Sequence, residues 1–303
     1  MFASRVSPAF LGWDLGGIIV RRVDEIDMSP ETSQWLLPGA TPGHLQDPWL
    51  RPDFTDGASF SMHVHIFAIE AHGRRILVDT GIGNDKPRQI PDADHLRTPL
   101  LHALTAAGFA PDTVDLVINT HMHVDHVGWN THLADGRWTP TFPNARYLTD
   151  RREWDHWTTA AETDEEVAQV HRDSLRPIRD HGLYDLLDLA APGLEVADGV
   201  RLVPTRGHTP GHLSVRLTGT DRTALISGDS LHHPVQLAHP EMGSVGDVDP
   251  GGARTTRHRL LTELAGTDDL LLGTHFTHPT GGRVHQQDGR FQLLADPPVF
   301  LAR

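Results

Sequence analysis

Side chains able to bind metal ions cluster between Asn119 and Asn130, a stretch that reads Asn-Thr-His-Met-His-Val-Asp-His-Val-Gly-Trp-Asn. It contains His121, His123, Asp125 and His126 within six positions. Histidine and carboxylate ligands suit Zn, Mn or Fe. The first two histidines would share one face of an extended chain, and the helical zinc pattern of two histidines four apart is absent. Four such side chains at one place can surround a dinuclear centre.

The apolar run 114–118 before this stretch predicts a short buried strand. The metal-binding side chains therefore follow a strand end, where loops on a rigid sheet commonly carry function. A polar loop that is histidine-rich by chance is the competing interpretation, because the chain has 22 histidines. The later sequence argues against chance.

Three later predicted strands also end in a His or an Asp. These are 200–204 followed by His208, 224–226 followed by Asp229, and 270–272 followed by His275. Asp79 ends the predicted strand 75–79 before a glycine-rich turn, and we expect it to accept a hydrogen bond from a metal-binding histidine. The repeated arrangement predicts that these side chains meet at one site.

The composition indicates a soluble globular enzyme. The 303 residues are 38% hydrophobic and 22% charged, which suits a folded chain with a substantial core, and we expect a single domain over 1–303. The formal charge of −14 argues against a nucleic-acid partner. There is no cysteine, so the metal ligands must be His, Asp or Glu. Neither a targeting segment nor an apolar run of about 18 residues is present, which predicts a cytoplasmic protein with no membrane contact.

Residues 1–58 form an N-terminal extension with an opening strand near 16–23. The Pro- and Gly-rich segment 29–58 should be irregular, and it is either a lid over the site or a plain surface loop. Residues 1–50 are also a candidate dimerisation segment. His63 and His65 are spaced like a ligand pair, but we expect them to be strand-face residues because no acidic partner lies nearby in sequence.

The remaining elements follow from periodicity and from capping residues. Strands are predicted over 60–70, 75–79, 144–148 and 213–217, and a closing hairpin over 283–295. Helices are predicted over 95–107, from Asp150 through Trp157, over 163–175 and over 253–266.

The pattern resembles the metallo-β-lactamase-fold hydrolase superfamily. The landmarks are Asp79-Thr80-Gly81, the stretch from His121 to His126, Gly207-His208, Gly228-Asp229 and His275, within roughly residues 60–285. The segments 228–236, 247–250, 275–276 and 282–284 are most similar to the methyl parathion hydrolase and quorum-quenching lactonase branches. The resemblance implies an α+β fold, a four-layer αββα sandwich of two mixed sheets with helices outside.

The resemblance also implies a ligand set for two divalent ions, zinc or alternatively iron or manganese. One ion would be held by His121, His123 and His208, the other by Asp125, His126 and His275, and Asp229 would bridge them. Such a pair of ions lowers the pKa of a shared water, so that hydroxide attacks an ester or a lactone. Asp125 and Asp229 are the expected catalytic carboxylates.

Residues next to the ligands in sequence are candidates for the substrate pocket. They are Trp129, His232, His233, Phe276 and His278. Their rings suit an apolar acyl or aryl group on a small-molecule substrate. Tyr147 and Tyr184 are not adjacent to a ligand, so neither is expected to act on the substrate.

Several other functions use similar sites. Phosphotriester or arylester hydrolysis needs the same ligands. A glyoxalase II-like thioesterase would need a basic patch for its anionic substrate, and none is clustered in the sequence. An iron persulfide dioxygenase uses only a subset of the ligands. An inert binding module would not be expected to keep all seven.

Overall fold

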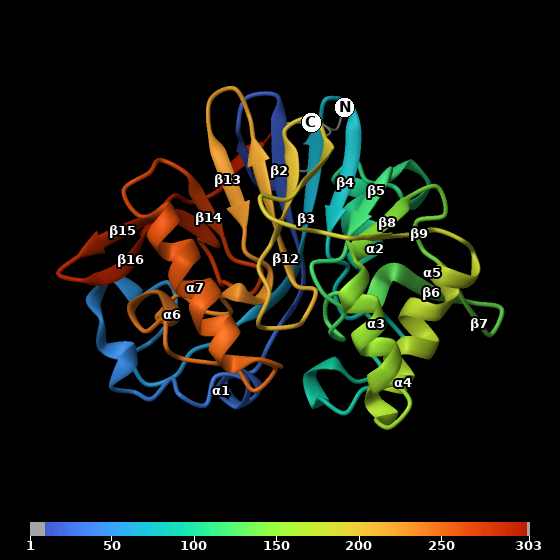
Figure 1. Cartoon of the computed structure of the whole chain (residues 1–303), viewed down its shortest axis with the longest axis horizontal. Coiled ribbons are helices and arrows are strands. Elements are labelled where there is room, and N and C mark those ends of the chain that lie inside the picture. The colour runs from blue at the N-terminus through green and yellow to red at the C-terminus, as the bar shows by residue number, and fades with distance from the viewer. Residues whose placement is uncertain (1–9, 302–303) are drawn as a thin grey trace, which may run out of the picture.

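The computed structural model describes residues 10–301, and two large β-sheets form its centre (Figure 1). The first sheet has the order β17 (Val299–Leu301), β1 (Phe10–Asp14), β2 (Ile18–Asp27), β3 (His63–Ala71), β4 (Arg74–Val78), β5 (Leu116–Ile118), β8 (Arg146–Asp150) and β9 (Tyr184–Leu187). The second has the order β10 (Leu194–Ala197), β11 (Val200–Pro204), β12 (Leu213–Thr218), β13 (Thr223–Ile226), β14 (Leu270–Leu272), β15 (Gly281–Gln287) and β16 (Arg290–Ala295). A separate hairpin joins β6 (Thr131–Ala134) to β7 (Arg137–Pro140).

Helices lie outside both sheets. They are α1 (Pro30–Leu36), α2 (Leu100–Ala106), α3 (Arg151–Ala160), α4 (Glu165–Val170), α5 (Arg176–Asp180), α6 (Val235–Ala238) and α7 (Pro250–Leu264). Short 3-10 turns occupy His44–Gln46, Pro48–Leu50, Pro91–Ala93, Pro111–Thr113, Gly128–Asn130 and Gly228–Ser230, and His171–Leu175 is a short π-helix. Within residues 10–301, no helix is long and apolar enough to cross a membrane.

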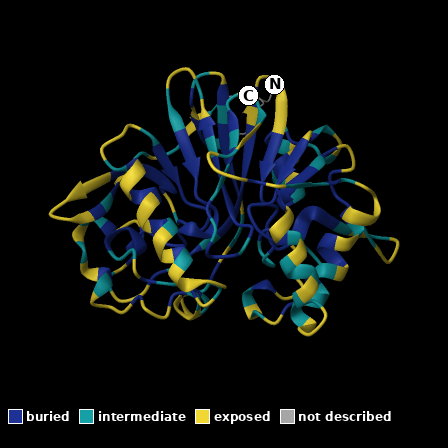
Figure 2. Cartoon of the chain, viewed as in Figure 1, coloured by how far each residue is buried: buried dark blue, intermediate teal, exposed yellow. Residues whose placement is uncertain are grey.

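Three layers of apolar side chains hold the sandwich together (Figure 2). Strand β3 shows how: Phe67 and Ile69 pack between the two sheets, whereas Ile66 and Ala68 face the helices α2 to α5. Both faces of the strand are covered, which explains why its sequence is almost continuously apolar rather than alternating. Removing this surface from water stabilises the fold by about 25 cal/mol per Å². The predicted four-layer αββα sandwich is confirmed.

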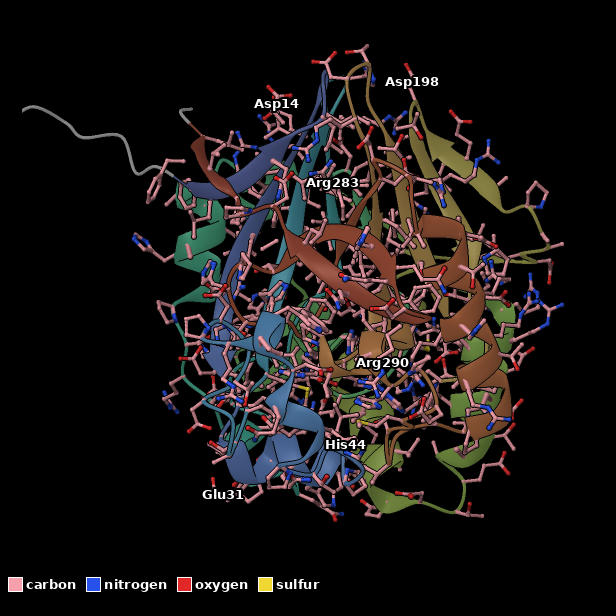
Figure 3. All side chains as sticks on the ribbon, turned by 90° about the vertical axis from the view of Figure 1, so that its left-hand side faces the viewer. Asp14, Glu31, His44, Asp198, Arg283 and Arg290 are labelled. Carbon is pink, nitrogen blue, oxygen red and sulfur yellow. The ribbon has the colours of Figure 1, made fainter. Side chains whose placement is uncertain are left out.

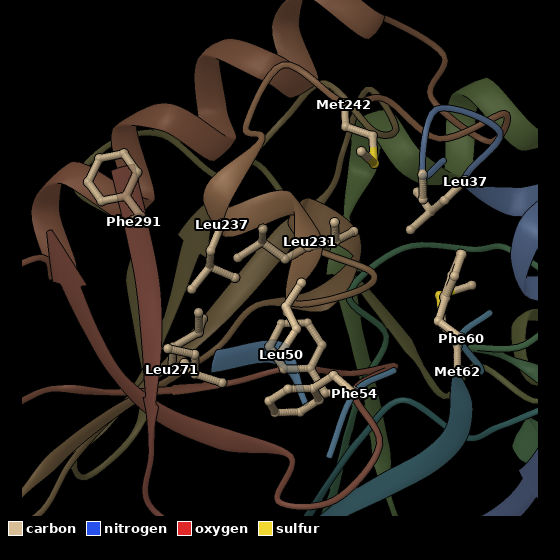
Figure 4. Close-up of a cluster of buried hydrophobic side chains, with 14 of the residues drawn as sticks. Leu37, Leu50, Phe54, Phe60, Met62, Leu231, Leu237, Met242, Leu271 and Phe291 are labelled. Carbon is tan, nitrogen blue, oxygen red and sulfur yellow. The ribbon is translucent and has the colours of Figure 1, made fainter. Parts of the chain in front are cut away.

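The segment between β2 and β3 contributes to the apolar layer that lies between the second sheet and the helices α6 and α7 (Figure 4). Leu37, Leu45 and Leu50 are fully buried, and Phe54 is nearly so. The alternative of a plain surface loop over 29–58 is therefore wrong, because the segment inserts apolar anchors into the core. The segment is irregular apart from α1 and two 3-10 turns, as predicted. Residues 1–9 of the predicted extension lie outside the described residues.

Most predicted elements are present, with one clear correction. The helix predicted over 95–107 begins only at Leu100, because Pro99 has no N–H to donate and disfavours helical geometry in the residue before it. The predicted helix 163–175 is α4 followed by the short π-helix, and it continues as α5 to Asp180. The short strands β1, β9, β10 and β17 were not predicted, since brief strands carry little periodicity.

The directions of the strands place their carboxyl ends, and the His and Asp residues that follow them, at one end of the sandwich. β4, β5 and β8 run parallel in the first sheet, and β11, β13 and β14 share one direction in the second. Their carboxyl ends therefore lie at the same end of the sandwich, near α1 at the bottom of Figure 1. Figure 3 shows Glu31 of α1 at this end, and Asp14 and Asp198 at the opposite end.

Candidate metal centre

The strand ends bring seven potential ligands together in two groups. One group contains His121, His123, His208 and Asp229, and the other contains Asp125, His126 and His275. Within each group, one ligand atom per residue lies within 4.8 Å of all the others. The seven residues predicted from spacing are therefore neighbours in space.

In the first group, three ring nitrogens converge. His123 Nδ1 lies 3.0 Å from His121 Nε2 and 3.0 Å from His208 Nε2. In the second group, His126 Nε2 and His275 Nε2 are 3.3 Å apart. Asp125 lies beside them, with one oxygen 3.6 Å from His126 and the other 3.5 Å from His275.

The opposite ring nitrogens are bound to acceptors that fix the histidine tautomers. His208 Nδ1 donates to Asp247 at 2.8 Å, and His126 Nδ1 donates to Asp79 at 2.9 Å. His275 Nδ1 donates to the backbone carbonyl of His63 at 2.7 Å. A carboxylate or a carbonyl can only accept, so Nδ1 carries a proton in each ring, and the neutral form of each ring has its lone pair on Nε2. The interaction predicted for Asp79 is present.

These tautomers make the donor set fit metal ions. In the neutral rings, the Nε2 atoms of His126 and His275 face one another at 3.3 Å, each with a lone pair. Such facing acceptors repel unless a cation lies between them. Histidine and carboxylate donors that are themselves held by outer hydrogen bonds are the ligand chemistry of Zn, Fe and Mn.

Asp229 lies between the two groups. Its Oδ2 is 3.5 Å from His208 Nε2 and 3.3 Å from His126 Nε2, and its Oδ1 is 3.2 Å from His275 Nε2. Oδ1 is buried and has no hydrogen-bond partner in the described chain. The backbone N–H of Asp229 donates to His212 Nε2 at 2.8 Å, which fixes the turn.

The electrostatics of the site favour bound cations. Burial lowers the pKa of His121 and His208 well below the usual value and lowers that of His123 to about 4, so their neutral, ligating forms dominate. Burial also acts on His126, but the carboxylates Asp229, Asp125 and Asp79 outweigh it and raise its pKa well above normal. The second group therefore attracts positive charge strongly.

Two acids with buried side chains, Glu153 and Asp247, were missed by sequence reasoning and hold the loops that carry the potential ligands. Glu153 on α3 accepts hydrogen bonds from Met122 N, Trp157 Nε1, Thr209 Oγ1 and Gly211 N, so it joins the loop after β5 to the loop after β11. Asp247 was quoted only as part of a family-like segment. No local signal links Glu153 to the site, since its partners lie 31 and 58 positions away in the chain.

A third such acid is Glu25 on β2. It accepts from Ile82 N, Gly83 N and Trp129 Nε1, and burial raises its pKa to about 7. The metal-binding loop approaches this turn so closely that a Cβ on Gly128 would lie 1.8 Å from the carbonyl oxygen of Ile82. Glycine is therefore required at position 128.

A cavity of about 430 Å³ opens over the metal-ligand groups. Its walls come from α1, the loop after β4, α4 and the loop 244–248. They are mostly apolar, with Ile26, Met28, Trp35, Leu36, Ile82, Ile90, Val124, Val167, Val170, Val245 and Val248 among the lining residues. No lysine or arginine lines the cavity among residues 10–301.

Of the five predicted pocket residues, His232 alone lines this cavity. It is buried, its Nδ1 has no hydrogen-bond partner in the described chain, and its Nε2 is 3.3 Å from Asp229. The other four were expected there because they adjoin ligands in sequence, but adjacent side chains project in different directions. Trp129 packs in the core and donates to Glu25, Phe276 lies in the core with Phe54, His233 bonds to the Phe54 carbonyl, and His278 is exposed.

The residues expected to be outside the site are outside it. His63 and His65 lie on β3 and belong to neither ligand group. Tyr147 and Tyr184 are buried in the outer core, where the Tyr184 hydroxyl donates to Asn119.

The comparisons with known proteins agree with this arrangement. The model of the Metallo-beta-lactamase superfamily matches residues 62–275. The Probable metallo-hydrolase Rv2300c of Mycobacterium tuberculosis is 30% identical over 190 residues, which cover 56% of this chain and 57% of that protein. The N-acyl homoserine lactonase AiiA of Bacillus thuringiensis subsp. kurstaki is 26% identical over 175 residues, covering 53% and 60%.

Among solved structures, the dizinc quorum-quenching lactonase AidC is similar over 97% of this chain and 99% of that one, with a TM-score of 0.77 and 22% identity. That likeness shows the same fold. The chain spans less than two thirds of the length of the curated relatives it matches. Since the family model matches most of the chain, including the strand ends described above, the protein belongs to the metallo-beta-lactamase superfamily.

Proposed function

We propose that this protein is a dinuclear metal-dependent hydrolase that cleaves a small ester or lactone. The observation that carries the proposal is the convergence of seven donors in two adjoining groups, with outer acceptors that keep Nε2 of His208, His126 and His275 free to bind metal. Lactonases among the relatives and structural neighbours support an ester or lactone bond as the target.

We assign His121, His123 and His208 to one ion and Asp125, His126 and His275 to the other, with Asp229 between them. Two divalent ions, zinc or otherwise iron or manganese, would supply a hydroxide nucleophile at neutral pH and polarise the substrate oxygen. The protein's part is to hold the ligands in fixed tautomers and to keep the site apolar around the reacting bond.

The cavity residues then orient the substrate. The apolar walls hold an acyl or aryl group and exclude bulk water. Asp125 lines the cavity and is only partly buried, so its carboxylate can orient the attacking group and pass a proton to the leaving oxygen. His232 lines the cavity with its Nε2 3.3 Å from Asp229, so it can hold that carboxylate in position beside the substrate.

Phosphotriester or arylester hydrolysis is the second candidate, because an apolar cavity without basic side chains also suits these neutral substrates. A glutathione thioester suits the cavity poorly, since its carboxylates would meet no lysine or arginine there.

The test combines metal quantification with a rate panel. Purified protein should bind two equivalents of metal and hydrolyse at least one of an N-acyl lactone, an aryl ester and a phosphotriester. Asp229→Ala should lose activity and part of the metal, while Asp198→Ala, an exposed acid at the opposite end of the sandwich, should lose neither. A fully metallated protein that cleaves nothing in the panel would refute the proposal.

A further inference from the structure

The solvent end of the cavity carries carboxylates that the proposed metal centre does not use. They are Asp92 from the 3-10 turn after β4, Asp164 at the N-cap of α4, and Glu166 in the first turn of that helix. We call these three residues the acidic rim. Five of the seven proposed ligands are buried and the other two are half-buried, whereas Asp164 is exposed and Asp92 and Glu166 are half-buried. The rim therefore lies closer to solvent than most of the ligands, and we infer that a substrate passes it on the way to the metal centre.

Hydrogen bonds hold two of the rim carboxylates, Asp92 and Asp164, in place, and no lysine or arginine among the described residues of the cavity lining neutralises the rim. Asp92 accepts hydrogen bonds from Ser29 N at 2.8 Å and from Ser29 Oγ at 2.6 Å. Partial burial raises the pKa of Asp92, but these hydrogen bonds outweigh burial and keep the pKa below its usual value. Asp164 accepts from two backbone N–H groups of α4. The carboxylate of Glu166 makes no hydrogen bond or ion pair with any described residue. The cavity lining contains no lysine or arginine within residues 10–301.

We propose that the acidic rim makes the site select neutral or cationic substrates and exclude anionic ones. This rests on the proposed hydrolase function and adds to it a substrate class and the residues that determine it. The apolar wall, with Trp35, Val167 and Val245, accepts an uncharged chain, while the rim repels a carboxylate or phosphate at its end.

The same charge distinguishes a substrate from its product. Hydrolysis of a neutral ester or lactone breaks the acyl carbon–oxygen bond, adds the hydroxyl of water to the acyl carbon and returns a proton to the leaving oxygen. The acid formed ionises at neutral pH. The rim therefore admits the neutral substrate and repels the anionic product, which favours release.

The test uses three N-acyl lactones of equal chain length that end in a methyl, a carboxylate or a trimethylammonium group. At 20 mM NaCl the wild-type kcat/KM should be about tenfold lower for the carboxylate than for the methyl compound. In 0.5 M NaCl this difference should shrink, because the screening length of exposed charges then falls below about 10 Å. Asp164→Asn with Glu166→Gln keeps the helix cap and should remove most of the discrimination.

The matched control is Glu162→Gln with Glu165→Gln, which changes the charge equally beside the same helix. Both control residues are exposed and do not line the cavity, and Glu165 pairs with Arg172. The control should discriminate like the wild type. Equal turnover of all three lactones by the wild type, or unchanged discrimination in the rim variant, would overturn the proposal.

Binding provides a readout that does not need catalysis. Trp35 and Trp157 line the cavity, so quenching of tryptophan fluorescence reports occupancy. If the methyl compound binds about tenfold more tightly than the carboxylate but neither is hydrolysed, the charge selection holds and the hydrolase proposal fails. If both bind and react equally, the hydrolase proposal holds and the charge selection fails.

Discussion

Replacing Asp247 with asparagine should weaken metal binding while leaving the fold intact. The side chain of Asp247 is buried, and its Oδ1 accepts from His208 Nδ1 at 2.8 Å. Burial opposes its ionised form, but the bond from His208 prevails and lowers the pKa of Asp247. The residue therefore carries a full negative charge behind a proposed ligand, which increases the basicity of His208 Nε2.

The size of the effect follows from what asparagine keeps and what it loses. Its amide oxygen can still accept from His208, so the lost contribution is the charge, and losing such a partner typically lowers metal affinity about 10–100-fold, or about 1.4–2.7 kcal/mol. The amide NH2 would also face Ser244 N, which now donates to Oδ2 at 3.0 Å. That clash of donors should lower the unfolding free energy by about 1–3 kcal/mol.

The assay is chelator competition followed by metal quantification, with Tm measured on the same samples. Asp249→Asn is the control, because Asp249 is exposed, caps α7 through Gly252 N and touches no ligand side chain, and asparagine keeps the cap. The control should retain wild-type metal affinity. If Asp247→Asn lowered the Tm but left the metal affinity unchanged, the inference that the Asp247 carboxylate increases the basicity of His208 would be refuted.

Three further predictions concern stability and the cavity mouth. Burial lowers the pKa of His233 to about 4, so folding should lose stability as pH falls from about 6.5 toward 4, where the unfolded chain binds the proton first; His233→Gln should show a shallower loss in urea titrations, and parallel curves would contradict this. Asp173→Asn should lower the free energy of unfolding in urea by about 3–5 kcal/mol, because it leaves the buried cations Lys86 and Arg88 unpaired. Lys86→Met should lower it by less, and a larger loss for Lys86→Met than for Asp173→Asn would contradict this reasoning. Trp35→Ala should raise KM several-fold for long acyl chains with little change in Tm, since this side chain is 55% exposed at the cavity wall; equal KM for all chain lengths would exclude such a contact.

The direction of the pH effect at His233 follows from its pKa in each state. The folded-state pKa lies below the unfolded value near 6.5, so both states are neutral above that pH and the full stability is present. Between about 6.5 and 4 the unfolded chain protonates and the folded chain does not, which favours unfolding. The folded state resists protonation because burial disfavours the charged ring, and a proton on Nδ1 would also remove the hydrogen bond that this atom accepts from Val235 N.

Local sequence was sufficient to predict the strands and the His and Asp residues that follow them, whereas the four layers and the division of ligands between two ions came from the family resemblance. The run 114–118 is apolar because β5 is buried on both faces, and a His or Asp after such a strand marks its carboxyl end. His208, Asp229 and His275 likewise follow the strands β11, β13 and β14. Asp150 caps α3 through Arg152 N as expected, because a cap needs only its own neighbours in sequence.

The supporting residues and the pocket depended on tertiary structure. Asp247 reaches His208 across 39 positions, and Glu153 joins two loops that come from different sheets. Trp129 and Phe276 adjoin proposed ligands in sequence yet point into the core, whereas Trp35 and Val245 line the cavity from distant segments. Spacing along the chain determines which residue types follow a strand, but which side chains face one another depends on how the strands are ordered and how the loops between them pack, and neither is encoded within a short window of sequence.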